Sequence, residues 1–400
     1  MVGEGGADAV LAAIGVLSSG ANSRLRSYIR SSWLSRERRE AAARAGVVVR
    51  FVLRGEDAPS EQRKEASEHG DTVFVPAPAS LGRAKGPLTS LFLWWQAALA
   101  QWPTADLIGK ADDDVYLHLH GIAAHLRASL SLVREATGAE PKVYWGAFEA
   151  YHYDELQEKQ VAFRQDRPGQ RCARVPASAR ALSHAHGAGG DTLVGRRTSD
   201  AAVHGPFPFA KGPLYLLSRS LVASLVANGQ VRQELNATLA HLSDRKGAGP
   251  ALYEDVWTGY ALSRWVGERG ARGLALVENG LGNGAPSPHY SDGYGMQLAP
   301  STLVWHMRTK RTQYRLAYAH HWEEVLGHHC AAPPAPHLPW VRCGWATARA
   351  STVSCTGARW QRCTSERRGS QLPNCSTALR ELKHAAKRWH AQNHARAALG

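Results

Sequence analysis

The sequence contains no uninterrupted apolar run of about 18 residues, the shortest length typical of a membrane-spanning helix. Its opening residues, Met1–Asp8, also lack the basic region that begins a secretory signal peptide. We therefore predict neither a membrane-spanning helix nor a cleaved leader within these 400 residues.

Cysteine is scarce until the C-terminal part of the chain, where five of the six cysteines lie. The six are Cys172, Cys330, Cys343, Cys355, Cys363 and Cys375. No two of them show the C-x2-C spacing of common zinc sites, so the sequence does not favour a structural zinc site. Their clustering indicates disulfides and an oxidising compartment, while a reduced set of cysteines remains the alternative.

A motif for binding DNA or RNA is also absent, although the formal net charge is +14. The basic residues are spread along the chain and are often interleaved with glutamate, as in Ser35–Arg44. We therefore predict no nucleic-acid partner. The positive charge favours an anionic substrate, or reflects only a solvated surface rich in arginine.

What the sequence does contain is a regular alternation of two kinds of segment up to Phe148. Short apolar segments of strand length are Val10–Ser18, Val47–Leu53, Thr72–Val75, Ala105–Lys110 and Lys142–Phe148. Segments with helical periodicity are Asn22–Ala45, ending at Gly46, then Glu61–His69, Leu88–Gln101 and Gly121–Thr137. Strands alternating with helices predict an α/β fold with a mostly parallel sheet, whose ligands gather at the carboxyl ends of the strands.

The second half of the chain is less regular. Residues 157–205 predict irregular structure, followed by a turn and an apolar segment in Phe207–Ser218 and a helix at Ser218–Asn228. A helix at Arg311–Trp322 is expected to close the main domain. The sequon Asn236-Ala237-Thr238 can carry a glycan if the chain enters the secretory pathway.

Three consecutive carboxylates, Asp112, Asp113 and Asp114, stand between two apolar runs. In an extended backbone, Asp112 and Asp114 would point to one face and Asp113 to the other. Adjacent anions repel one another, so the fold tolerates them best beside a hard divalent cation such as Mg²⁺ or Mn²⁺. The alternatives are a solvated acidic turn or a calcium loop, and the calcium spacing with its closing glutamate is missing.

Two further features bear on this site. Glu254 and Asp255 open a helical segment, where acids are favoured by the helix dipole alone or serve a site together with the triplet. His306 lies in a short apolar strand, Thr302–Arg308, where it is either a satisfied core residue or a metal ligand.

Six short motifs of this chain occur in an order that identifies a family. They are Arg26-x-x-Ile29-Arg30-x-x-Trp33, Phe51-Val52-Leu53-x-Gly55, Glu65…Gly70-Asp71, Lys110-Ala111-Asp112-Asp113-Asp114-Val115, Pro208…Gly212…Tyr215-x-x-Ser218 and Glu254-Asp255-Val256-x-x-Gly259. In this order they resemble the β-1,3-galactosyltransferase family (glycosyltransferase family 31), whose wider group includes the fringe-type N-acetylglucosaminyltransferases. The resemblance extends over roughly Ala9–Arg311.

The resemblance implies a GT-A type fold, a UDP-sugar donor and Mn²⁺ as the cofactor, with Mg²⁺ as the alternative. It also implies β-1,3 transfer with inversion to a glycan or glycoprotein acceptor in the Golgi lumen. By the same resemblance, Asp114 and His306 would hold the metal and Asp255 would act as the base that deprotonates the acceptor hydroxyl. Inversion requires one such base and in-line attack at the anomeric carbon.

The resemblance also predicts how the donor is held. Asp112 and Asp113 would lie close to the ribose and the uracil of the UDP-sugar. Arg26 and Arg30 follow the first strand, where they could assist the diphosphate; placement on the surface is the alternative.

Two segments depart from the family pattern. Ala210–Tyr215 carries Lys211 and Pro213 in place of small flexible residues, and Pro87–Phe92 lacks the lysine usual there. We expect galactose as the transferred sugar, with N-acetylglucosamine as the alternative. An inactive glycan-binding relative and a metal-dependent phosphohydrolase remain the alternatives from other functional classes.

We predict four parts of the chain: a catalytic domain at 9–326, a linker at 327–339, a small Cys- and Trp-rich module at 340–376, and a basic helical tail at 377–400. Members of the family are type II membrane proteins, yet Val10–Ser18 already matches their first catalytic strand. We therefore expect an incomplete N-terminus, with membrane contact only through an anchor that this sequence does not include.

Overall fold

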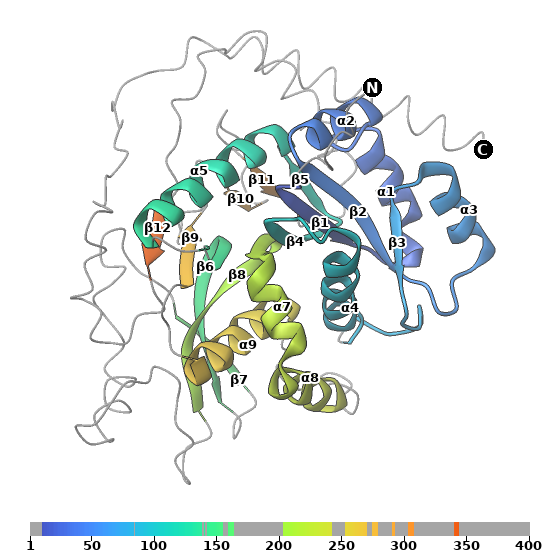
Figure 1. Ribbon diagram of the computed structural model, residues 1–400. Coiled ribbons are helices and arrows are strands. Elements are labelled where there is room, and N and C mark those ends of the chain that lie inside the picture. Colours follow the sequence, from blue (N-terminus) through green and yellow to red (C-terminus); the bar gives the residue numbers. More distant parts are fainter. Residues whose placement is uncertain are drawn as a thin grey trace, which may run out of the picture.

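The computed structural model describes residues 10–83, 85–137, 140, 142–154, 159–163, 203–241, 253–269, 274–278, 290–292, 303–307 and 340–343. These residues form a mixed α/β fold, with a nine-stranded sheet, a small three-stranded sheet and helices on both sides of the larger sheet (Figure 1). The arrangement confirms the α/β fold class predicted from the sequence.

The larger sheet has the strand order β12-β9-β6-β8-β4-β1-β2-β3, with β7 paired to β6. Its strands are β1 (Ala12–Leu17), β2 (Val47–Arg54), β3 (Thr72–Val75), β4 (Leu107–Asp112), β6 (Lys142–Asp154), β7 (Lys159–Phe163), β8 (Val203–Ser218), β9 (Leu274–Glu278) and β12 (Trp340–Cys343). The strands β4, β1, β2 and β3 run parallel, whereas β8 runs antiparallel to both of its neighbours, β4 and β6. The smaller sheet joins β10 (Tyr290–Asp292), β11 (Val304–His306) and β5 (Val115–Leu117).

The described helices are α1 (Ser23–Arg30), α2 (Arg36–Arg44), α3 (Ser60–His69), α4 (Gly86–Gln101), α5 (Leu119–Thr137), α7 (Arg219–Ala227), α8 (Gly229–His241) and α9 (Glu254–Arg269), with a 3-10 turn η1 (Gly20–Asn22). The C-terminal end of α3 is explained by its sequence. The helix stops at Gly70, whose φ of 59° is the left-handed conformation that glycine adopts without strain. The helices predicted at the positions of α3, α4, α5 and α7 are confirmed within a few residues at their ends.

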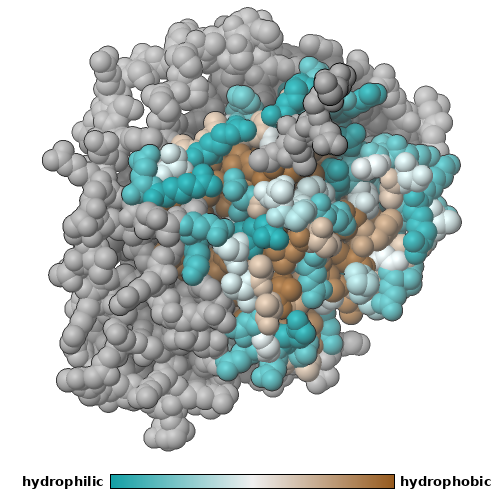
Figure 2. Space-filling view, viewed as in Figure 1, coloured by the Kyte–Doolittle hydropathy of each residue, from teal (hydrophilic) through white to brown (hydrophobic). Residues whose placement is uncertain are grey.

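Two hydrophobic cores lie on the two faces of the larger sheet. In β1, Ile14 packs into one core and its neighbour Ala13 into the other, because successive strand residues point to opposite faces. The helices α1, α2 and α5 cover the first face, and α4, α7, α8 and α9 cover the second (Figure 1). On the face of the molecule shown in Figure 2, apolar residues lie toward the middle and hydrophilic residues around them.

The predicted single helix Asn22–Ala45 is wrong, because the structure has two helices there. The helix α1 ends at Arg30, and the Ser32 hydroxyl donates to the carbonyl oxygen of Tyr28 at 2.7 Å. After this turn the Ser35 hydroxyl accepts from the N–H of Arg38 and caps α2. Helical periodicity continues through the break, so it could not reveal that serines here bond the backbone and interrupt the helix.

The central part of the chain is also more regular than the sequence suggested. The strand β7, Lys159–Phe163, lies within the range predicted as irregular, and the remainder of that range up to residue 202 lies outside the described residues. The predicted turn at Phe207 is instead part of β8, which pairs with β6 here and with β4 from Leu214 onward. Pairing with β6 outweighs the low strand propensity of the proline residues in this segment.

The C-terminal predictions fall mostly outside the described residues. Trp340–Cys343, the start of the predicted small module, forms β12 and pairs with β9 in the larger sheet. The predicted helix Arg311–Trp322, the linker and the rest of the module and tail lie outside the described residues, so the cysteine pairing and the domain boundaries stay predictions. Among the helices described, none combines the length and the apolar character needed to cross a membrane.

Candidate functional site

The acidic triplet lies at the carboxyl end of β4, beside the carboxyl end of its parallel neighbour β1. The register pairs Leu17 with Asp112, so the turn that follows each strand leaves the same edge of the sheet. Asp113 and Asp114 form the tight turn between β4 and β5. The triplet is therefore not fully extended as expected, although Asp112 and Asp114 do converge.

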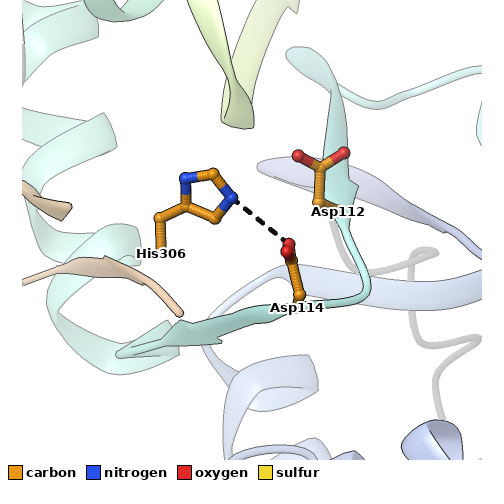
Figure 3. Close-up of side chains that lie close together, drawn as sticks. All are labelled: Asp112, Asp114 and His306. Carbon is orange, nitrogen blue, oxygen red and sulfur yellow. Dashed lines mark ion pairs between the residues drawn. The ribbon is translucent and has the colours of Figure 1, made fainter. Parts of the chain in front are cut away.

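Asp112, Asp114 and His306 form a group that could hold a metal ion. One ligand atom from each lies within 4.8 Å of the others, and Figure 3 shows the three side chains pointing toward one another. His306 comes from β11, which pairs antiparallel with β5, and the N–H of Met307 donates to the carbonyl oxygen of Asp114 at 2.9 Å. Two carboxylates and an imidazole are a donor set that suits Mn²⁺, and Mg²⁺ if waters complete the shell.

The two carboxyl groups of this group differ in their pKa values. Burial raises the pKa of Asp112 to about 6, with Glu254 and Asp114 adding to the effect and Lys110 opposing it. Burial also acts to raise the pKa of Asp114, but the hydrogen bond and charge of His306, 3.4 Å away, hold that pKa below its ordinary value. Asp114 is thus the carboxylate more readily charged at neutral pH, as the first metal ligand should be.

Asp113 turns away from this group toward the end of β1. Its Oδ2 accepts from the Ser18 hydroxyl at 2.6 Å and from Nδ2 of Asn22 at 2.8 Å. Burial raises the pKa of Asp113, while these two hydrogen bonds oppose the rise. Asp113 therefore ties the turn after β4 to the turn after β1; its predicted contact with the nucleotide stays a prediction.

Arg26 and Arg30 point into the fold, where both bind carboxylates, and their predicted contact with the diphosphate stays a prediction. Arg26 is fully buried and binds both carboxylate oxygens of Glu65, at 2.8 and 2.6 Å. Arg30 contacts Glu65 at 2.6 Å and both oxygens of Asp71 at 2.9 Å. Arg26 reaches the site only indirectly, through a 3.1 Å hydrogen bond to the Ser18 hydroxyl. The sequence could not show that both cations already have carboxylate partners.

The second acidic motif begins α9, as predicted. Asp255 accepts two backbone hydrogen bonds, from the N–H of Gly212 in β8 and from the N–H of Val256, each at 2.8 Å. Burial raises the pKa of Asp255 to about 7, and the neighbouring charge of Glu254 adds to this, while Lys110 and the backbone hydrogen bonds oppose it. A carboxyl group with a pKa near neutrality is suited to exchange a proton with a substrate hydroxyl.

Lys110 and Gly212 join the two acidic motifs, and neither was predicted as a site residue. The Lys110 side chain is 1% exposed, and its Nζ contacts Asp112 Oδ1 and Glu254 Oε1, each at 2.5 Å. It also donates to the carbonyl oxygen of Gly212 at 2.7 Å. Burial acts to lower the pKa of Lys110, but the surrounding carboxylates raise it well above its ordinary value. The one available signal was a lysine inside the otherwise apolar run Leu107–Ala111.

The two motifs meet at Gly212. A Cβ at this position would lie 3.3 Å from Asp112 Oδ2 and 3.3 Å from Asp255 Oδ2. These two oxygens are therefore no more than twice that distance apart. The arrangement combines a group suited to a cation and its phosphate ligands with a separate carboxyl base.

Residues 24–238, more than half of the chain, match the family model described as galactosyltransferase. The matched range includes Asp112–Asp114 and Gly212 but ends before Asp255 and His306, so those two residues join the site through geometry alone.

Solved glycosyltransferases resemble the chain only weakly. One is the galactosyltransferase LgtC in complex with donor and acceptor sugar analogues, with 9% identity, coverage of 74% of this chain and 87% of that chain, and a TM-score of 0.31. Another is mouse xyloside xylosyltransferase 1, with 13% identity, coverage of 74% and 96%, and a TM-score of 0.29. Similarity of this size says nothing about the donor, the acceptor or the mechanism of this chain.

Proposed function

The chain belongs to the galactosyltransferase family, and from this premise we propose that it transfers galactose from UDP-galactose to a hydroxyl group of a glycan or glycoprotein. The proposed linkage is β-1,3, and the proposed transfer inverts the anomeric centre. The mixed sheet flanked by helices agrees with the GT-A type of fold that this family implies.

One observation carries the proposal. The group Asp112, Asp114 and His306 lies close to Asp255, and the Gly212 backbone and the Lys110 ammonium lie between the two acidic motifs. A diphosphate held at the first set would place its sugar near the second. An inverting transfer in a single displacement needs the group that binds the diphosphate and the base that activates the acceptor to be separate.

The proposed cofactor is Mn²⁺, held by Asp114 and His306 with Asp112 close enough to contribute. When bound, such a cation supplies positive charge that stabilises the departing UDP, so no protonated acid is needed for the leaving group. The oxygen and nitrogen donors of the three residues fit this ion. The other contribution of the chain is to orient the donor at the ends of β1 and β4.

Asp255 is the proposed base. Its carboxyl group accepts two backbone hydrogen bonds, which fix its orientation, and within the described part of the chain it forms no ion pair with lysine or arginine. Its raised pKa of about 7 makes the carboxylate a stronger base than an ordinary aspartate while keeping it largely charged above neutrality. A positioned base of this kind contributes roughly 10²–10⁴-fold to the rate.

A donor screen tests the proposal directly. The purified chain is incubated with UDP-galactose, UDP-N-acetylglucosamine and UDP-glucose, each with Mn²⁺, Mg²⁺ or a chelator, and UDP release is measured with and without galactoside acceptors. We expect UDP release from UDP-galactose that requires Mn²⁺ and rises with the acceptor. Preference for UDP-N-acetylglucosamine would change the donor assignment. Binding without turnover would indicate an inactive glycan-binding relative, and phosphate release from plain nucleotides would indicate a phosphohydrolase.

We extend the proposal to the compartment: the enzyme works in the Golgi lumen. Asn236 of the sequon Asn236-Ala237-Thr238 lies exposed on α8, where an oligosaccharide could attach. The test is a mass shift on treatment of the cellular protein with a glycosidase specific for N-linked glycans. An unglycosylated cellular protein would count against a secretory location.

A further inference from the structure

Lys110 is buried at the centre of a closed ring of contacts that involves three elements. Its Nζ contacts Glu254 of α9 and donates to the carbonyl oxygen of Gly212 in β8. The N–H of the same glycine donates to Asp255, the neighbour of Glu254. The ring therefore engages both backbone polar groups of Gly212 and both acids at the start of α9.

The ammonium group of Lys110 is surrounded by three oxygens of the fold. It donates hydrogen bonds to Asp112 and to the carbonyl oxygen of Gly212, and it forms an ion pair with Glu254. Its side chain is 1% exposed. The position of Lys110 therefore indicates an internal task.

The two acids at the start of α9 have different kinds of partner. Glu254 contacts the Lys110 ammonium at 2.5 Å, whereas Asp255 takes backbone N–H groups as partners. The side chain of Glu254 is only 10% exposed, and removing the Lys110 cation would leave it buried without this ion pair. Without the Lys110–Glu254 pair, the first turn of α9 would carry two buried acids and, among the residues that the structure describes, no lysine or arginine in an ion pair with them.

We propose that Lys110 and Glu254 are positioning residues that hold Asp255 in its catalytic orientation and couple it to Asp112 on the donor side. This inference rests on the proposed function, because it assigns the two residues a role in the same transfer. Neither residue touches the substrate. Their effect reaches the reaction through the backbone of Gly212 and through the first turn of α9.

The variant Glu254→Gln tests the proposal with the least change in shape. Glutamine keeps the length of the side chain and an oxygen that can accept from Lys110, but it loses the charge. We expect kcat for sugar transfer to fall about 10- to 100-fold, since small errors in the position of a base cost rates of this size. The dissociation constant for UDP with Mn²⁺ and the KM for the acceptor should change less than about twofold, because their binding groups are untouched.

A second readout does not depend on turnover. Hydrogen exchange at the Gly212 N–H reports its bond to Asp255, and we expect exchange about tenfold faster in Glu254→Gln than in the parent. Lys110→Met, which removes the cation while filling its space, should give the same faster exchange. The matched control is Glu40→Gln, which removes a glutamate from an exposed pair with Arg36 and should change neither kcat nor this exchange.

The outcomes separate this inference from the proposed function. Unchanged exchange at Gly212 in Glu254→Gln overturns the inference whether or not the parent transfers sugar. Unchanged kcat in an active protein overturns it as well, as does a parallel loss of kcat, UDP affinity and thermal stability, which would indicate a structural role only. A parent protein without transferase activity overturns the proposed function, while the exchange result still decides whether the ring positions Asp255.

Discussion

Asp112 and Asp255 come from a strand and a helix far apart in the sequence, yet each places a carboxylate oxygen 3.3 Å from the point where a Cβ of Gly212 would lie. The first residue belongs to the candidate metal group and the second is the proposed base. Gly212 therefore lies between the two carboxyl groups, and a side chain there has almost no room.

Replacing Gly212 by alanine tests how tightly this region is built. The added methyl carbon would lie 3.1 Å from Lys110 Nζ and 3.3 Å from the oxygens of Asp112 and Asp255, so these charged groups must shift by a few tenths of an ångström. We expect kcat to fall at least about tenfold, because catalysis depends on their positions more than folding does. Steady-state transfer assays and thermal melting measure the two effects.

The control for this substitution is Gly229→Ala at the start of α8, where an added Cβ would meet no atom within 4 Å. Kinetic constants should stay at the parental values, with stability unchanged or raised by up to about 1 kcal/mol from the better helix propensity of alanine. Full activity of Gly212→Ala would mean that the two carboxylates do not act at this point.

The pH dependence of transfer follows from the pKa of Asp255, which is about 7. A base must be deprotonated to act, so kcat should fall as the pH drops below this pKa and approach a plateau above it. The rate is measured between about pH 5.5 and 8.5 at saturating metal and donor. The variant Asp255→Asn has no such carboxyl group, and its residual rate should lose this rise. A flat profile for the parent protein would contradict the assignment of Asp255 as the base.

Arg30 should matter for stability rather than for donor binding. The variant Arg30→Met leaves Glu65 and Asp71 without this cation, and the Asp71 side chain is only 1% exposed. Glu65 keeps Arg26 and Asp71 keeps Arg39, so the loss of the charged hydrogen bonds of Arg30 costs about 1.5–3 kcal/mol, measurable by denaturant unfolding. UDP affinity measured well below the melting temperature should stay within about twofold of the parental value.

The control for Arg30→Met is Arg36→Met, which breaks an exposed pair with Glu40 and should cost less than about 1 kcal/mol. Loss of UDP affinity in Arg30→Met with unchanged stability would instead support the diphosphate contact predicted from the sequence.

The alternation of strands and helices was readable from the sequence because each element has its own hydrophobic period. The acidic triplet, the acids that begin α9 and the strand that carries His306 were readable too, since each is a local pattern. What the sequence could not show is which local patterns meet. That depends on strand register, such as the antiparallel pairing of Lys110 with Tyr215 that brings Gly212 beside the triplet.

The same limit applies to Arg26 and Arg30. Two arginines after a first strand suit an anionic ligand, but they suit Glu65 and Asp71 equally well, and the sequence contains no information on which anion is nearer. The partners of Asp113 could not be predicted either. They are Ser18 and Asn22 from the turn after β1, and no sequence pattern marks these two residues as partners of an acid.

The central claim is that the two acidic motifs have separate tasks in one site, the first binding the metal and the diphosphate and the second activating the acceptor. The most direct test measures Mn²⁺-dependent UDP binding by calorimetry and sugar transfer in parallel for the parent, Asp114→Ala and Asp255→Asn. Asp114→Ala should weaken UDP binding at least about 100-fold, since even residues that only support metal ligands are worth about 10- to 100-fold. Asp255→Asn should bind UDP as the parent does and lose transfer by about 10²–10⁴-fold. Parental transfer by Asp255→Asn, or equal loss of UDP binding in both variants, would contradict the account.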